Sequence, residues 1–172
     1  MTLAASPIPV ALLSFLAAAG ITTGLVPVVR HLGLRFGFTD KPDPRKQHST
    51  PMVRLGGVAM VLGFALSLTI VWLLGGFGLL AQERDQLIWS TLAGGLCFFL
   101  IGLADDLFSL SPWPRLAGQI AISCAIWSQG VRIGAIDLPW LTSAGSAITL
   151  PDSLSLLATV IWLVGITNAI NW

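Results

Sequence analysis

Long stretches without a charged residue constrain the fold of this chain more than any other feature. Residues 1–29, 55–81, 87–104 and 153–172 contain no Asp, Glu, Lys or Arg. About 20 consecutive apolar residues form a helix long enough to cross the hydrocarbon core of a bilayer. With 55% hydrophobic and only 10% charged residues, the chain could not bury its apolar surface in one soluble core. The sequence therefore predicts an all-α integral membrane protein.

Turn-forming residues divide the chain into about five transmembrane helices within one membrane domain. The Gly-rich segment 75–78 should end the second helix, and Ser111 with Pro112 should begin the fourth as N-cap and first helical residue. Residues 131–139 partly alternate between apolar and polar types, which predicts a short β-hairpin between the fourth and fifth helices. The expected spans are approximately 9–29, 55–74, 87–104, 113–130 and 153–172.

The distribution of Lys and Arg predicts how these helices are oriented. Segment 30–54 contains six of the nine, and Arg115 follows the third span, whereas Arg84 and Arg132 fall on the other side. Basic residues are enriched in cytoplasmic loops, so the N-terminus is expected outside and segment 30–54 inside, as a structured loop. The ends of the third and fifth spans then face the cytoplasm.

Two adjacent carboxylates, Asp105 and Asp106, follow the third uncharged stretch directly. The dipole of the helix and the repulsion between the two acids both disfavour negative charge at this end. A cation is therefore expected nearby, either a divalent metal or the basic side chains of Arg115, Lys46 and Arg45. A solvated polar loop at the edge of the membrane remains the alternative.

Two further groups of polar residues are expected at the same membrane face. Arg45, Lys46 and His48 lie in a Pro-rich loop that leads into a Gly-Gly pair at the start of the second span, a pattern that favours phosphate. The preference of basic residues for the inner face would also place the Lys and Arg there. Asn168 and Asn171, three residues apart, share one side of the fifth helix. They would either pack against a neighbouring helix or bind a ligand.

Carboxylates and phosphate groups repel each other, so a shared site needs a divalent cation between them. Mg²⁺, or Mn²⁺ in its place, is commonly held by one or two carboxylates and by the phosphate oxygens of a substrate. This combination is typical of phosphoryl transfer. At the inner face of a membrane it predicts one water-soluble and one lipid-borne substrate.

Four segments, in this order, resemble the polyprenyl-phosphate N-acetylhexosamine-1-phosphate transferases, the glycosyl transferase family 4. They are Asp40–His48 with Pro51 and Arg54–Gly57, then Gly102–Asp106, then Arg115–Leu116 with Gln119, and finally Thr167–Asn171. The resemblance covers residues from about 20 to 172. The forms of the first segment are more similar to the undecaprenyl-phosphate N-acetylglucosamine-1-phosphate branch than to the muramoyl-pentapeptide branch.

The resemblance implies transfer of an N-acetylhexosamine 1-phosphate, here N-acetylglucosamine 1-phosphate, from its UDP-sugar to polyprenyl phosphate, with Mg²⁺ required and UMP released. The reaction would start cell-envelope glycans, such as peptidoglycan or lipopolysaccharide, at the cytoplasmic face of the inner or plasma membrane. Asp105 and Asp106 would bind the metal or deprotonate and orient the lipid phosphate. The implied substrate-binding residues are Arg45, Lys46, His48, Arg115, Asn168 and Asn171.

Two departures from the family pattern are visible. Position 115 is Arg where the family commonly has Lys, and the planar fork of an Arg differs from the point charge of a Lys. The chain also ends at Trp172, where the family continues into a further acidic motif and more spans. The resemblance thus implies the N-terminal portion of such an enzyme, inactive by itself. Membrane lipid is an expected partner, nucleic acid is not, and a homodimer is left open.

Other functions remain in competition. A phospho-N-acetylmuramoyl-pentapeptide transferase would use the same segments. A transporter could line an ion path with Asp105, Asp106 and Asn171, although its polar groups would then lie nearer the middle of the bilayer. A scaffold whose basic loop binds anionic lipid would explain the cations but not the Asp pair. The pair favours the transferase.

Overall fold

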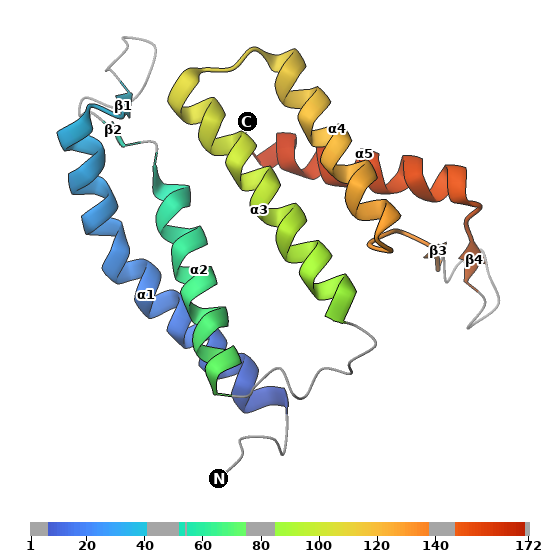
Figure 1. The fold of residues 1–172 in the computed structure, drawn as a ribbon, viewed down its shortest axis with the longest axis horizontal. Coiled ribbons are helices and arrows are strands. Elements are labelled where there is room, and N and C mark those ends of the chain that lie inside the picture. Colours follow the sequence, from blue (N-terminus) through green and yellow to red (C-terminus); the bar gives the residue numbers. More distant parts are fainter. Residues whose placement is uncertain (1–6, 41–51, 54, 75–84, 138–146, 171–172) are drawn as a thin grey trace. The chain divides into compact units, whose positions relative to one another are not determined.

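The computed structural model describes residues 7–40, 52–53, 55–74, 85–137 and 147–170. These residues form five α-helices and two short pairs of strands (Figure 1). The helices are α1 (Pro7–Phe36), α2 (Gly56–Leu73), α3 (Asp85–Phe108), α4 (Pro112–Ser128) and α5 (Asp152–Ile170). The predicted all-α membrane fold is confirmed.

Four of these helices are long and apolar enough to cross a membrane. The segments that meet both conditions are Val10–Phe36, Gly56–Leu73, Gln86–Phe108 and Asp152–Ile170. A helix also forms at the expected fourth span, but α4 has only 17 residues and would be about 26 Å long at 1.5 Å per residue. The shortest of the four candidate helices, α2, has 18 residues. Helix α4 therefore falls short of the other four in length.

The first helix is longer than the sequence predicted. Helix α1 continues through Phe36, so the expectation of a loop is wrong for residues 30–36. Gly37 ends the helix in a left-handed conformation, with φ of 75°. The N–H of Phe38 donates to the carbonyl of Gly33 at 2.9 Å, and that of Gly37 donates to the carbonyl of Leu34. This is the Schellman arrangement of a helix C-terminus, which favours glycine at the left-handed position.

The chain forms two compact units, of which the first is Met1–Gln82 together with Gly102–Ser109. In this unit α1 and α2 pack antiparallel (Figure 1). The Ser67 hydroxyl donates to the backbone carbonyl of Ser14 at 2.8 Å. Gly63 lies against the side chain of Thr22, so closely that a Cβ at this position would overlap it. Small residues at the interface let the two backbones approach, as is usual for helices packed within a membrane.

Two short strands join the ends of this helical hairpin. Strands β1 (Thr39–Asp40) and β2 (Met52–Val53) pair antiparallel, with Thr39 opposite Val53 and Asp40 opposite Met52. The sequence analysis did not predict this pairing. It brackets residues 41–51, which lie outside the described residues and contain Arg45, Lys46 and His48.

The second unit is Glu83–Ile101 together with Leu110–Trp172. In this unit, the part of α3 up to Ile101 contacts α4 at two glycines. A Cβ at Gly94 would lie 2.7 Å from Ile126 Cγ2, and a Cβ at Gly118 would lie 2.8 Å from Ile101 Cδ1. Both values are below ordinary contact distances. Each helix therefore offers a glycine to an isoleucine of the other.

Helices α4 and α5 pair antiparallel through polar contacts at both ends. The Trp127 indole Nε1 donates to Ser155 Oγ at 3.1 Å, and Asn168 Nδ2 donates to Gln119 Oε1 at 2.7 Å. The predicted hairpin between the two helices is also present. Strands β3 (Ala135–Ile136) and β4 (Ile148–Thr149) pair antiparallel, with Ala135 opposite Thr149.

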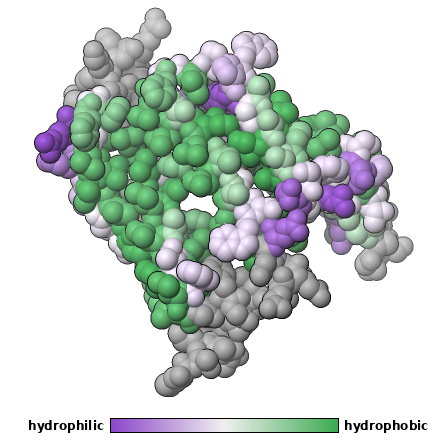
Figure 2. Space-filling view, viewed as in Figure 1, coloured by the Kyte–Doolittle hydropathy of each residue, from purple (hydrophilic) through white to green (hydrophobic). Residues whose placement is uncertain are grey.

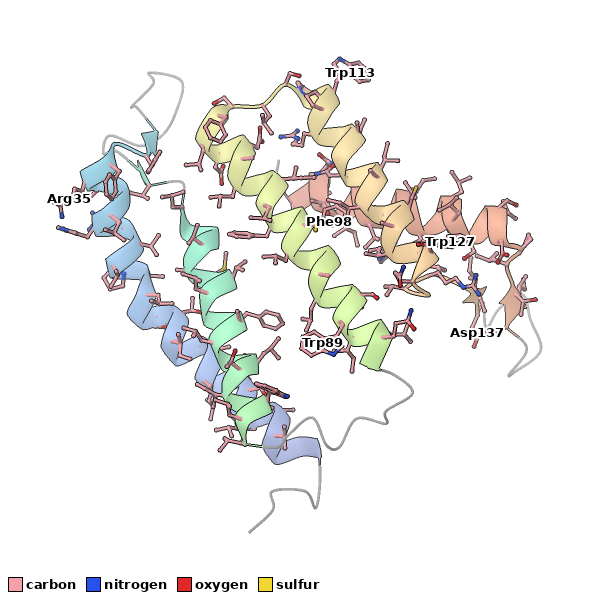
Figure 3. The ribbon with its side chains drawn as sticks, in the orientation of Figure 1. Arg35, Trp89, Phe98, Trp113, Trp127 and Asp137 are labelled. Atoms are coloured by element: carbon pink, nitrogen blue, oxygen red, sulfur yellow. The ribbon has the colours of Figure 1, made fainter. Side chains whose placement is uncertain are left out.

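The distribution of side chains fits a lipid environment. Large apolar side chains such as Phe64, Leu100 and Ile161 are exposed, and apolar residues cover much of the visible surface (Figure 2). Small and polar residues occupy most of the buried positions, which reverses the pattern of a soluble protein. Trp113 is 78% exposed at the start of α4, as expected for a side chain at the membrane interface (Figure 3).

Replacing Gly94 with Ala should destabilise the protein, because the new methyl group would press on Ile126. Overpacking of this kind costs about 1–3 kcal/mol, partly offset by the better helix propensity of Ala. The neighbouring Gly95 provides a matched control, since nothing lies within 4 Å of its Cβ position. Thermal unfolding in detergent, followed by size-exclusion chromatography, should rank G94A below G95A. Equal or reversed midpoints would contradict this account of the packing.

Candidate active site

The Asp pair belongs to the last turn of α3. The sequence placed the end of this helix at Ala104, but α3 continues to Phe108 because no residue from 105 to 108 is Gly or Pro. Consecutive side chains on an α-helix point about 100° apart. Asp105 is half-buried and Asp106 is exposed. The two carboxylates therefore leave the helix in different directions and meet different surroundings.

Ser109 ends α3 in a conformation that is uncommon for a residue with a side chain. Its φ is 49°, and its N–H donates to the carbonyl of Asp105 at 2.8 Å. Two residues later, Ser111 has extended backbone angles and precedes Pro112, as the sequence predicted for the start of α4. The Ser111 side chain makes no capping hydrogen bond. Only three residues thus connect the turn that carries the Asp pair to the next helix.

Arg115 lies in the first turn of α4 and is half-buried. The N-terminus of a helix carries partial positive charge, so it adds to the charge of a guanidinium and favours an anionic ligand. Gln119, one turn further along the same helix face, is buried. Helix α4 therefore presents a cation and an amide along one line.

Asn168 is in contact with Gln119. Its Nδ2 donates both to Gln119 Oε1 at 2.7 Å and to the backbone carbonyl of Val164 at 2.8 Å. The sequence identified Asn168 as a candidate ligand-binding residue and matched Gln119 to a family motif, but it did not predict that they meet. The sequence signal for such a contact is an amide side chain within an apolar helix, because it needs a hydrogen-bond partner.

The remaining candidates are not part of the described structure. Arg45, Lys46, His48 and Asn171 all lie outside the described residues.

Carboxylates are common metal ligands, and two lie side by side in the sequence at Asp105 and Asp106. Within the residues that the structure describes, no three His, Cys, Asp or Glu side chains gather as they would in a closed metal site. Mg²⁺ differs from such metals because one or two carboxylates, waters and substrate phosphates complete its coordination. Asp105 and Asp106 fit this donor set.

Comparison with known proteins identifies the family. The family model of glycosyl transferase family 4 matches residues 88–172. A probable undecaprenyl-phosphate N-acetylglucosaminyl 1-phosphate transferase of Bacillus subtilis is 29% identical over 86% of this chain and 37% of its own length. A decaprenyl-phosphate N-acetylglucosaminephosphotransferase of Mycolicibacterium smegmatis is 33% identical over 91% of this chain and 39% of its own length. The chain belongs to glycosyl transferase family 4.

The relatives do not all have the same named substrate. A phospho-N-acetylmuramoyl-pentapeptide-transferase of Latilactobacillus sakei is 25% identical over 73% of this chain. The chain spans less than two fifths of the length of the relatives it matches. No solved structure matches it. The protein is thus a multi-pass membrane member of a transferase family.

Replacing Ser109 with Val should destabilise the turn after the Asp pair. A β-branched residue is strongly disfavoured at positive φ, and such strain costs about 1–3 kcal/mol. Ser111 is the matched control, because its extended backbone accepts Val and its side chain caps nothing. The thermal midpoint of S109V in detergent should lie below that of S111V, and S109G should not be destabilised. A midpoint for S109V equal to that of S109G would show that the turn is unstrained.

Proposed function

We propose that the protein transfers N-acetylglucosamine 1-phosphate from its UDP-sugar to a polyprenyl phosphate and releases UMP. The alignment with two transferases named for this sugar, over 86% and 91% of the chain, is the observation that carries the proposal. The polar residues described above agree with it, because an acidic pair, an Arg at a helix N-terminus and a pair of bonded amides are groups that a charged substrate would need.

The reaction takes place at the cytoplasmic face of the cell membrane in this proposal. The basic segment 30–54 supports the sidedness, since it contains six of the nine Lys and Arg residues. Arg30, His31 and Arg35 are exposed along the last two turns of α1, and Arg35 points away from α2 (Figure 3). A basic helix end of this kind suits the anionic inner surface of a membrane.

The chemistry is a phosphoryl transfer in this proposal. An oxygen of the lipid phosphate attacks the β-phosphorus of the UDP-sugar, the bond from that phosphorus to the bridging oxygen breaks, and UMP leaves. Mg²⁺, or Mn²⁺, would neutralise the diphosphate when it is bound. Because Asp105 and Asp106 point about 100° apart, we assign them separate tasks: one holds the metal and the other orients the lipid phosphate or takes its proton.

Arg115 binds the diphosphate in this scheme. A guanidinium can make two parallel hydrogen bonds to phosphate oxygens, which a Lys cannot do, and the N-terminus of α4 adds partial positive charge. The proposed substrate-binding residues also include Asn171 and, in the segment before α2, Arg45, Lys46 and His48.

A phospho-N-acetylmuramoyl-pentapeptide transferase is the second candidate, supported by the relative from Latilactobacillus sakei. Its lower identity, 25% against 29% and 33%, favours the N-acetylglucosamine substrate. The assay uses membranes containing the protein expressed from its complete reading frame, undecaprenyl phosphate and either radiolabelled UDP-sugar. Label should pass into the organic phase only with UDP-N-acetylglucosamine, and should return to water when UMP is added. Transfer only from the muramoyl-pentapeptide donor would select the second candidate.

Replacing either Asp105 or Asp106 with Asn should lower kcat by at least about 100-fold, the usual size of a lost acid, base or metal ligand. The two variants should differ in how they respond to Mg²⁺. Loss of a metal ligand should raise the Mg²⁺ concentration needed for half-maximal activity, whereas loss of the base should not. Asp137, an exposed acid after β3, is the control, and D137N should keep full activity. Full activity in either D105N or D106N would remove that residue from the mechanism.

A further inference from the structure

Gln119 stands apart from the other buried polar residues of the described structure. The others are Ser67, Ser123, Ser155 and Thr159, all with small hydroxyl side chains. Gln119 carries a large carboxamide and is only 4% exposed. Burying an amide in an apolar helix costs free energy unless its hydrogen bonds are satisfied. Its bond to Asn168 at 2.7 Å is thus the main compensation that the structure shows.

The bond also fixes the orientation of Asn168. A carboxamide has two N–H donors and one carbonyl acceptor. Asn168 Nδ2 donates to Gln119 Oε1 on the neighbouring helix and to the carbonyl of Val164 on its own helix. With both donors held by fixed acceptors, the plane of the amide is set. A ligand at Asn168 would therefore meet its carbonyl oxygen Oδ1 and not an N–H.

A carbonyl oxygen recognises particular chemistry. It accepts a hydrogen bond from an O–H or N–H group and coordinates a hard cation, but it repels the oxygens of a phosphate. In a site for a nucleotide sugar, Oδ1 would face a hydroxyl or ring N–H group, or a cation with its waters. The phosphate oxygens need other donors, such as Arg115.

Helix packing does not by itself account for the pair. The other end of the α4–α5 contact is already held by Trp127 and Ser155, by the N–H of Ile133 bonded to Thr159 Oγ1, and by the ion pair of Arg132 with Asp152. Figure 3 shows Trp127 at that end. Gln119 lies about two turns before Trp127 on α4, and Asn168 lies near the C-terminal end of α5.

We infer that Gln119 is a positioning residue that holds the Asn168 carboxamide with its carbonyl oxygen directed to the substrate or to its cation. The inference rests on the proposed transferase function. Gln119 acts only through Asn168, so its effect should vanish when Asn168 is absent. No direct contact of Gln119 with substrate is required.

A double-mutant cycle tests this dependence. Gln119→Met keeps the length of the side chain and removes the acceptor, Asn168→Ala removes its partner, and the double variant combines both. The kinetic constants for UDP-N-acetylglucosamine are measured in the protein from the complete reading frame. Q119M should lower kcat/KM by about 10-fold, equivalent to about 1.4 kcal/mol, the scale of one hydrogen bond. In the N168A background the same change should alter kcat/KM by less than about 2-fold.

Two variants separate positioning from packing. Gln119→Glu keeps an acceptor oxygen and should retain more of kcat/KM than Q119M. Ser155→Ala removes the acceptor of Trp127 at the other end of the same helix pair. It should lower the thermal midpoint but leave the kinetic constants of the folded protein unchanged. If Q119M does not fold, Gln119→Asn, which withdraws the same oxygen by one methylene, replaces it in the cycle.

The outcomes are distinct. Equal losses from Q119M in the presence and absence of Asn168 would overturn the inference and leave the proposed function intact. A loss of kcat/KM in S155A as large as that in Q119M would also overturn it, because packing would then explain both. No transfer of sugar phosphate by the unaltered protein would overturn the proposed function, and the inference with it.

Discussion

Polar groups inside an apolar membrane helix have no water to bond, so each must find its partner within the protein. The rest of this structure depends on that constraint. Among the described residues, every buried side-chain nitrogen or oxygen has a hydrogen-bond partner. Ser123 and Thr159 bond to carbonyls one turn back on their own helices. Gln119 has no such local solution and bonds to Asn168 on another helix. The need of the Gln119 amide for a hydrogen-bond partner thus joins α4 to α5, at residues that belong to two family motifs.

The same constraint explains where charge is tolerated. Asp105 and Asp106 occupy the last turn of α3, and Arg115 occupies the first turn of α4. Chemistry is therefore concentrated at helix ends, while glycines and small hydroxyl residues pack the helices between them.

Much of this arrangement could be predicted from the sequence, because hydrophobic length and turn residues act locally. The five helices, the Ser111–Pro112 start of α4 and the hairpin of β3 and β4 all follow from such signals. Contacts between distant residues could not be predicted in this way. Pairing of Thr39 with Val53 and of Gln119 with Asn168 needs the tertiary fold. The sequence predicted the first span to end at residue 29, where charged residues begin, whereas α1 continues to Phe36 and is followed by Gly37 in the left-handed conformation typical of a helix C-terminus.

The pairing of α1 with α2 has a consequence for the biogenesis of the protein. A hydrogen bond between them joins Ser14 and Ser67, which are 53 residues apart in the sequence, and α2 ends at Leu73. Ribosomes add about 5–20 residues per second, whereas helices rearrange in microseconds to milliseconds. Once α2 has entered the membrane, the hairpin has seconds to form before α5 is synthesised. The later helices can then pack against a hairpin that has already formed. The five helices therefore do not have to assemble in a single step.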